Sequence, residues 1–204
     1  MVDFDRLYSF RPKGRRRALH VHQRGDIEGN LIVFRGELAP KRPIVYDYMR
    51  GASGSTAYDL VSTSYGVPFL VSRGVVDALQ GFRGWMTFRV ELYGKQNERV
   101  PGYSGLVITG RCGPIQPERS EWIWREPAVP HGKVTRALLG IYFDEATWDG
   151  TDLFVPEKTG AVVIVQKVKD ALEAAKISNA SIERLSESLM SPIGFHIRDP
   201  ESDL

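Results

Sequence analysis

The chain has 204 residues, and its 42% hydrophobic and 25% charged content is typical of a soluble globular protein. A single cysteine excludes an internal disulfide and favours a reducing compartment. The formal net charge is only +2, yet residues 1–50 hold eleven Lys/Arg against six Asp/Glu, whereas residues 144–204 hold six against twelve. The early acidic residues and the short apolar runs indicate neither a secretory signal nor a membrane span, so we expect one cytoplasmic domain over residues 1–204.

Residues 1–28 show no clean periodicity, and we expect them to form a basic, irregular N-terminal segment. At its centre the sequence RPKGRRR, residues 11–17, has the composition of a basic loop. The LHVHQ sequence that follows alternates in the manner of a short strand. Further strands are expected over residues 30–36 and 43–49, followed by a Gly/Ser-rich loop over residues 50–56.

The sequence LVSRGVVDALQ at residues 70–80 returns as VIVQKVKDALE at residues 163–173. In each copy a short apolar strand precedes apolar residues at i, i+3, i+4 and i+7, which is the spacing of one helical face. A strand candidate follows each helix with the same spacing. The pattern predicts two similar β-α-β units, at about residues 68–92 and 161–185, and we interpret them as scaffold. The helical faces consist of Val75, Ala78, Leu79 and Phe82 in the first unit and Val168, Ala171, Leu172 and Ala175 in the second.

The remaining segments complete the predicted organisation. Residues 102–110 and 121–126 favour strands. Residues 144–160 are expected to form a long loop, and residues 190–204 an irregular tail. Strands outnumber helices, so the sequence predicts an α+β fold with a mixed, mostly antiparallel sheet and few helices.

Candidate catalytic and metal-binding residues are few. The sequence has no nucleotide-binding, zinc-protease or nucleophile-elbow motif, so we expect no cofactor and no metal. His20 and His22 would share one face of a strand, but no third ligand lies nearby in the sequence. Cys112, next to a cation, could act as a nucleophile if His131 or His196 supplied the base. A buried cysteine at the end of a strand is the simpler interpretation.

The basic segment suggests a second class of function. The arginines between Arg11 and Arg17, together with Arg24, could contact phosphate groups. A stacking platform for single-stranded nucleic acid also needs aromatic residues, and none is interleaved with these arginines. Nucleic-acid binding is therefore the less favoured interpretation.

Two sets of residues are candidates for contact with a protein partner. Aspartates in the long loop most simply form turns and caps, and docking onto a basic partner is the second interpretation. Acid–base catalysis, with Asp59 as a further carboxylate, ranks behind both. The paired tryptophans would share one face of a strand, either in the core or as interface anchors. The candidates are Asp144, Glu145, Asp149 and Asp152 in the loop, and Trp122 and Trp124 in the strand.

Three segments, DLVSTSYGVPFLVSRGVVDAL, GYSGLVITGRCGPI and GIYFDEATWDGTDLFVPEKTGAVVIVQKVKDAL, resemble a bacterial protein family. It is immunity-protein family eleven of polymorphic toxin systems, formerly a domain of unknown function, which is abundant in myxobacteria and other proteobacteria. The resemblance covers about residues 40–190. The matching residues are Asp59, Ser72, Asp77, Ala78, Leu79, Gly113, Pro114, Phe143, Asp144, Trp148, Asp149, Gly150, Asp152, Pro156, Val168, Ala171 and Leu172.

The resemblance implies a cytoplasmic immunity protein that binds and neutralises a cognate toxin, such as a nuclease, by direct contact and without catalysis. The toxin would be the product of a neighbouring gene. Two alternatives remain from the residues themselves. One is an enzyme that uses Cys112 or a carboxylate cluster, and the other is a nucleic-acid-binding protein that uses the basic segment 11–24.

Overall fold

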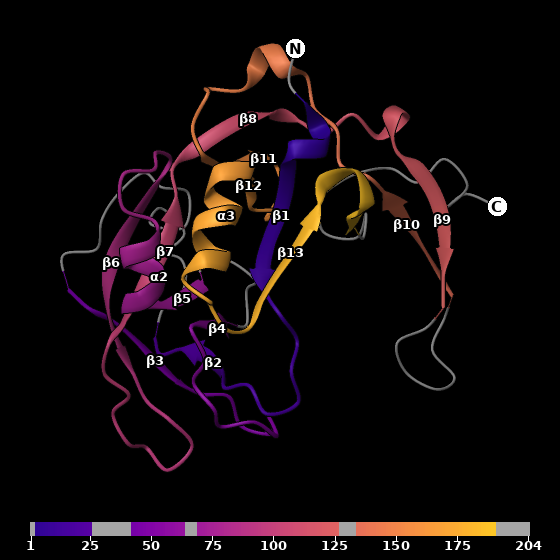
Figure 1. The fold of residues 1–204 in the computed structure, drawn as a ribbon. Coiled ribbons are helices and arrows are strands. Elements are labelled where there is room, and N and C mark those ends of the chain that lie inside the picture. Colours follow the sequence, from indigo (N-terminus) through magenta and orange to yellow (C-terminus); the bar gives the residue numbers. More distant parts are fainter. Residues whose placement is uncertain (1–2, 26–41, 64–68, 127–133, 191–204) are drawn as a thin grey trace.

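The computed structural model describes residues 3–25, 42–63, 69–126 and 134–190, which form a mostly β structure with two α-helices (Figure 1). Its strands belong to a closed six-stranded barrel, a five-stranded sheet and a three-stranded sheet. The predicted α+β class, with mixed sheets and few helices, is confirmed.

The elements are grouped by sheet. The barrel contains β2 (His20–Gln23), β3 (Ile44–Tyr48), β4 (Leu60–Thr63), β5 (Phe69–Ser72), β6 (Trp85–Leu92) and β7 (Tyr103–Ile108). The five-stranded sheet contains β1 (Leu7–Pro12), β8 (Gly110–Pro114), β11 (Leu153–Glu157), β12 (Val163–Val165) and β13 (Ala180–Arg184). The three-stranded sheet contains β9 (Glu121–Arg125), β10 (Thr135–Leu139) and β14 (Leu189–Met190). The helices are α2 (Arg73–Ala78) and α3 (Gln166–Ala174), with the 3-10 turns η1 (Phe4–Arg6), η2 (Pro117–Arg119), η3 (Glu145–Thr147) and η4 (Leu185–Glu187).

The barrel closes in the order β2-β3-β6-β7-β5-β4, with β2 and β4 paired in parallel. Side chains alternate between the interior and the outside along its strands. Val21 and Tyr46 therefore point into the barrel core, while their neighbours His22 and Asp47 pair on the outer surface. This places both histidines of β2 on the outside of the molecule.

The two predicted β-α-β units are present, and each contains a third strand that the repeat did not reveal. In the first unit, β5 and β6 both pair antiparallel with β7, which lies between them. In the second, β12 and β13 both pair antiparallel with β1. Each unit is thus a pair of parallel strands split by an antiparallel strand, with one helix as the crossover.

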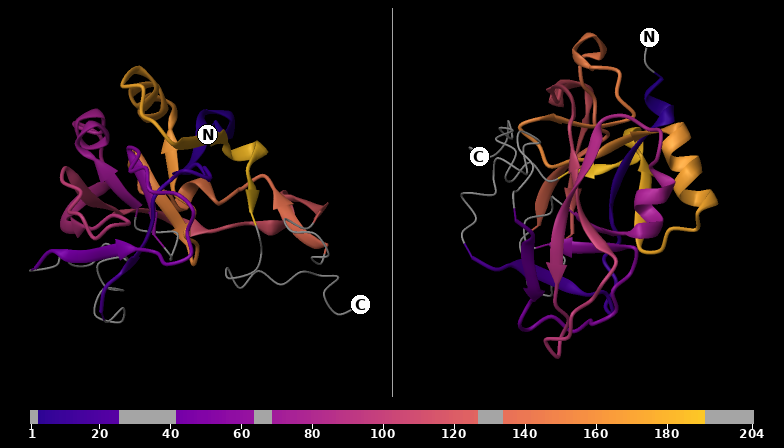
Figure 2. Two further views of the ribbon diagram at one scale, coloured as in Figure 1. Left: turned by 90° about the horizontal axis from the view of Figure 1, so that it is seen from below. Right: turned by 90° about the vertical axis from the view of Figure 1, so that its left-hand side faces the viewer.

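The two helices lie side by side on one side of the molecule (Figures 1 and 2). Val75 and Leu79 of the first unit and Val168 and Leu172 of the second are buried in one shared core cluster. Burying a valine or leucine side chain stabilises a fold by roughly 1.5–3 kcal/mol. The repeated apolar spacing therefore joins the two units through a common core.

The expectation of an irregular segment is wrong for Leu7–Pro12, which form β1, whereas the short strand expected in LHVHQ is present as β2. β1 lies inside the five-stranded sheet, between β13 and β12. Leu7 contacts one core cluster, whereas Tyr8 and Phe10 contact another, so the start of the strand is buried on both faces and Arg11 near its end is exposed. Because Leu7 and Tyr8 are buried next to each other, apolar and polar residues do not alternate over the whole strand.

Of the remaining predictions, one is wrong and two fall on residues that the structure does not describe. The expected long loop over residues 144–160 contains β11, whose Leu153 and Phe154 are both buried, so that prediction is wrong. The expected strand over residues 30–36 lies outside the described residues, as does the expected irregular tail beyond Met190. No helix in the described part of the chain has the length and apolar character that crossing a membrane requires.

The three-stranded sheet stands out from the rest of the molecule, in the order β14-β10-β9 (Figures 1 and 2). We call this sheet the arm. Leu138 and Met190 anchor the base of the arm in the core cluster that also contains Phe143 and Phe154. The outermost strand, β9, carries the two tryptophans.

Candidate protein-binding surface

The four acidic candidates do not form one cluster, and Asp152 is buried with only 5% of its surface exposed. The backbone N–H of Arg83 donates to its Oδ2 at 2.8 Å, and Lys167 Nζ lies 2.7 Å from its Oδ1. Arg83 precedes β6, and Lys167 lies on α3, so Asp152 ties the two β-α-β units together. Because it is inaccessible in this structure, the prediction that Asp152 contacts a partner is not supported.

Asp149 completes the outer edge of β8. Its Oδ2 accepts a hydrogen bond from Arg111 N at 2.7 Å, and its own N–H donates to Arg111 O at 3.1 Å. Thr151 donates to Oδ1 through both its N–H, at 3.0 Å, and its Oγ1, at 2.6 Å. Partial burial would raise the pKa of Asp149, but the hydrogen bonds from Thr151 and Arg111 outweigh it and hold that pKa below its ordinary value. The turn-forming interpretation therefore describes this residue.

The other two acids belong to η3. Asp144 is its N-cap, and its Oδ1 accepts a hydrogen bond from Ala146 N at 3.0 Å. Glu145 is the first residue of the turn and is half-buried. Of the four predicted acids, Asp144 and Asp149 are exposed, Glu145 is half-buried and Asp152 is buried, so the four carboxylates do not share one accessible surface.

Cys112 lies within β8 rather than after a strand, and it is buried. Burial, together with the nearby carboxylate of Asp149, raises the pKa of the thiol to about 12. A thiol with such a pKa stays protonated at neutral pH and is a poor nucleophile. The bases considered with it, His131 and His196, lie outside the described residues.

Asp59 is held in a hydrogen-bond network between the two units. Ser72 Oγ, at the start of α2, donates to Asp59 Oδ1 at 2.5 Å. Ser178, in the turn before β13, donates to Oδ2 through its N–H at 2.8 Å and its Oγ at 2.6 Å. Partial burial would raise the pKa of Asp59, but these hydrogen bonds prevail and lower it. An ionised, fully engaged carboxylate of this kind is structural and is poorly suited to act as a general acid.

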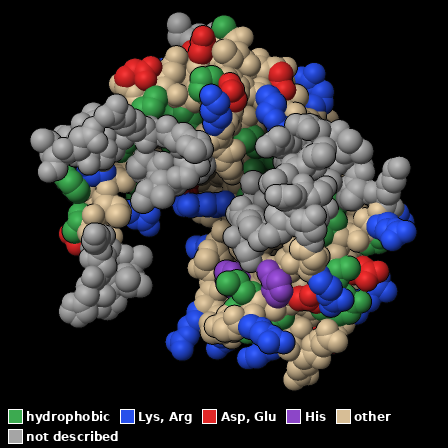
Figure 3. Space-filling view, turned by 180° about the vertical axis from the view of Figure 1, so that it is seen from behind, with side chains coloured by type: hydrophobic (Ala, Val, Ile, Leu, Met, Phe, Trp, Pro, Cys, Tyr) green, Lys and Arg blue, Asp and Glu red, His purple; other side chains and the backbone are tan. Residues whose placement is uncertain are grey.

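The basic residues of the N-terminal segment are partly engaged as well. Arg11 pairs with Glu183 at 3.2 Å across the β1–β13 ladder. Arg24 donates to both carboxylate oxygens of Asp47, at 2.7 and 2.6 Å, and lies over the ring of Tyr93. His20 and His22 are half-buried, and Figure 3 shows Lys and Arg side chains on the same face of the molecule as the histidine side chains. Within the part of the chain that the structure describes, no group of three His, Cys, Asp or Glu side chains could hold a metal ion.

Trp122 and Trp124 share one face of β9, as predicted, and they differ in environment. Trp122 packs against the core cluster at the base of the arm. Trp124 lies further out, with 66% of its surface exposed. Arg136 of β10, paired with Trp124 in the ladder, lies between them, and its guanidinium carbon is 5.0 Å from the ring of Trp122 and 5.4 Å from that of Trp124. We call these three residues the aromatic patch.

The arrangement of the aromatic patch suits contact with another protein. The Arg136 cation lies within cation–π distance of both rings, so a partner would meet aromatic and charged groups in one place. Trp and Arg are the residue types most often responsible for binding energy at interfaces. The sequence identified both tryptophans but not Arg136, whose position opposite Trp124 depends on the β9–β10 register.

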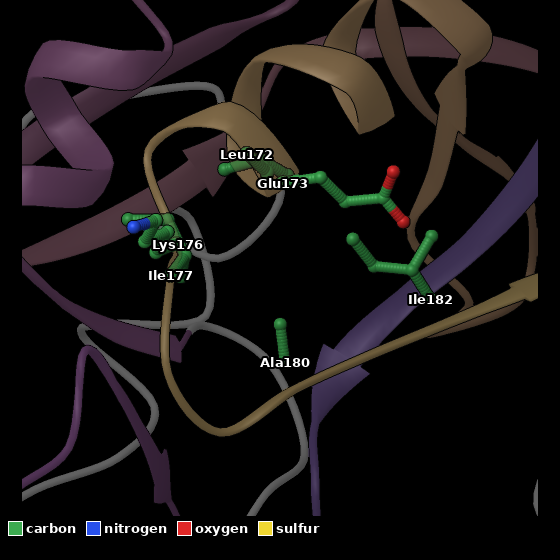
Figure 4. A pocket seen from close by; sticks show the side chains of 6 residues that line it. All are labelled: Leu172, Glu173, Lys176, Ile177, Ala180 and Ile182. Atoms are coloured by element: carbon green, nitrogen blue, oxygen red, sulfur yellow. The ribbon is translucent and has the colours of Figure 1, made fainter.

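A pocket of about 350 Å³ lies between the end of α3 and β13 (Figure 4). Leu172, Ile177 and Ile182 give it an apolar floor. Its one carboxylate, Glu173, already accepts a hydrogen bond from Lys169 at 2.8 Å. The lining offers no convergent set of polar groups to orient a small molecule, so the aromatic patch is the stronger candidate.

Comparison with known proteins adds no relative: no protein-family model matches the chain, and no curated protein matches it. Several residues that carry the sequence resemblance are held in internal hydrogen bonds: Asp59, Ser72 and Asp152 connect the two units, and Asp149 caps the edge of β8. Their contacts define a scaffold, and a partner-specific surface is to be sought on other residues.

Proposed function

We propose that this protein is an immunity protein that binds and neutralises a cognate toxin by direct protein–protein contact. The single observation that carries the proposal is the aromatic patch, in which Arg136 of β10 lies against Trp122 and Trp124 of the outer strand β9 of a projecting arm. Such a patch supplies the anchor of a protein interface, and the family resemblance supplies the class of partner.

The sequence suggested that the acidic loop could dock onto a basic partner, and the structure gives this interpretation little support. A basic nuclease cleft would attract a cluster of carboxylates, but Asp149 and Asp152 are occupied by internal hydrogen bonds. Asp144 remains at the surface of η3. The proposed contact is therefore centred on the aromatic patch, with Asp144 as a peripheral charge.

Co-expression with the product of the neighbouring gene tests this proposal. The full chain should restore growth to cells that produce the toxin, and the two proteins should co-purify. Trp124→Ala should weaken rescue, because truncating a central aromatic anchor typically costs about 2 kcal/mol or more of binding energy. Met49→Ala is the matched control, since Met49 is an exposed hydrophobic residue (43%) that follows β3 on the barrel. Failure of the wild-type chain to rescue would reject the proposed function.

Cys112→Ser separates this proposal from the enzyme alternative. An inhibitor that acts by contact keeps its rescue activity when the buried thiol becomes a hydroxyl, provided that the variant folds. A thiol enzyme loses its activity. Near-ultraviolet circular dichroism of the variant establishes that the tertiary structure is retained.

One observation favours a second candidate, nucleic-acid binding by the barrel. The sequence offered no aromatic residue among the arginines, but the fold places Arg15 over Tyr58 and Arg24 over Tyr93. Aromatic rings beside cations are the components of a single-strand binding surface. This candidate requires affinity for single-stranded oligonucleotides that falls with rising salt and is reduced by Arg15→Ala.

A further inference from the structure

No strand among the described residues pairs with the outer edge of β9. β9 pairs with β10 alone among the described strands, and it is the last strand of the arm. In an antiparallel ladder, alternate residues of an edge strand point their N–H and C=O groups away from the sheet. No hydrogen bond joins this edge to another described residue, so no described segment takes the place of a further strand.

The chain protects another edge that would otherwise be exposed. β8 is an outer strand of the five-stranded sheet, and the segment that contains η3 covers it. Asp149 accepts from Arg111 N, and Thr147 Oγ1 accepts from Gly113 N at 2.8 Å. A covered edge does not template pairing with another chain. β9 has no such cover among the described residues and contains no Pro, and its two charged residues, Glu121 and Arg125, stand at its ends.

The sequence of β9, EWIWR, is complementary to itself when it is read in the opposite direction. In an antiparallel pair of two such strands centred on Ile123, Glu121 of each copy lies opposite Arg125 of the other. Trp122 of each copy likewise lies opposite Trp124 of the other. Opposite charges and aromatic pairs are the cross-strand combinations that stabilise antiparallel sheets. Glu121 and Arg125 are both exposed and form no ion pair with another described residue.

From these observations we propose that the protein forms a two-fold symmetric dimer in which β9 pairs antiparallel with β9 of a second copy. The two arms then become one continuous six-stranded sheet. Because side chains alternate across a strand, the four tryptophans lie on one face, and Ile123 and the charged pairs lie on the other. The two-fold axis passes between the Ile123 residues, which makes the interface isologous.

A charge-exchange series tests the pairing and its register. Sedimentation velocity of the full chain over a micromolar concentration series should show a monomer–dimer equilibrium for the wild type. Glu121→Arg and Arg125→Glu each place like charges opposite one another twice per dimer, and each should raise the dissociation constant at least about tenfold. The double variant restores opposite charges at both positions, and it should dimerise like the wild type.

Mixing the two single variants tests the antiparallel β9 pairing most directly. Each variant carries charges of one sign at both ends of β9, and the signs differ between the variants, so an equimolar mixture should form a heterodimer. Arg16→Glu, an exposed charge change in the loop before β2, serves as the control and should leave association unchanged. A wild type that stays monomeric throughout, or a double variant as weak as the single ones, would overturn the proposal.

The dimer does not depend on the proposed function. A chain that dimerises through this series yet fails to rescue cells from the neighbouring gene product would reject the immunity role and leave the pairing intact. A chain that rescues cells but stays monomeric would support the immunity role and reject the β9 pairing. The exchanged charges lie on the face opposite the tryptophans, so the double variant retains the aromatic patch.

Discussion

At the scale of single residues, Asp152 shows how a side chain that sequence analysis assigned to a partner can instead be part of the scaffold. Asp152→Asn should lower the free energy of unfolding by about 1–3 kcal/mol, because it removes the charge that pairs with Lys167 and weakens the hydrogen bond from Arg83 N. Urea denaturation measures this loss. Asp144→Asn is the matched control, since asparagine also caps a helical turn, and its cost should stay below about 0.5 kcal/mol.

Asp59 predicts a pH dependence of stability. Its pKa in the folded protein is lowered from the ordinary value of 3.8, so its stabilising contribution is present above that value and is lost as the pH falls through the lower folded pKa. The difference in unfolding free energy between the wild type and Asp59→Asn should therefore be constant near neutral pH and shrink below about pH 4. Denaturation curves at successive pH values check this. A difference that does not change over the acidic range would show that the carboxylate is not the group responsible.

At the scale of elements, the repeat makes a comparative prediction. Leu79 and Leu172 occupy equivalent positions in the two β-α-β units and are buried in the same cluster. Leu79→Ala and Leu172→Ala should each destabilise the protein by about 2–5 kcal/mol, the range for truncating a buried leucine. Glu173→Ala, at an exposed position of α3, should cost far less. If only one leucine variant lowered the denaturation midpoint, the two units would not share one cooperative core.

Some strands could be predicted from the sequence and others could not. β6 and β13 were recognisable because each follows a helix of the repeat, and β6 also alternates with a period of two. β1 and β11 were harder to recognise, because each begins with two consecutive buried residues, Leu7 and Tyr8 in β1 and Leu153 and Phe154 in β11, which interrupt the alternation. The pairing of β1 inside the second unit is a contact between residues more than 150 positions apart, and no local pattern encodes it.

At the scale of the whole molecule, this topology changes how the basic segment can be tested. Deleting residues 1–17 would remove β1 from the middle of the five-stranded sheet, so the deletion would unfold the protein rather than probe nucleic-acid binding. Substitution of exposed side chains such as Arg16 tests the charge without removing a strand. The aromatic patch could be predicted only in part from the sequence. Trp122 and Trp124 are recognisable as a pair on one strand, but Arg136 joins them only through the β9–β10 register.

The affinity of the full chain for the neighbouring gene product, measured by titration calorimetry, tests the central claim most directly. The account predicts a one-site isotherm for the wild type and a dissociation constant raised at least about thirtyfold by Trp124→Ala, equivalent to about 2 kcal/mol, with Met49→Ala unchanged. Equal affinities for the wild type and Trp124→Ala, or heats that show no binding at all, would contradict it.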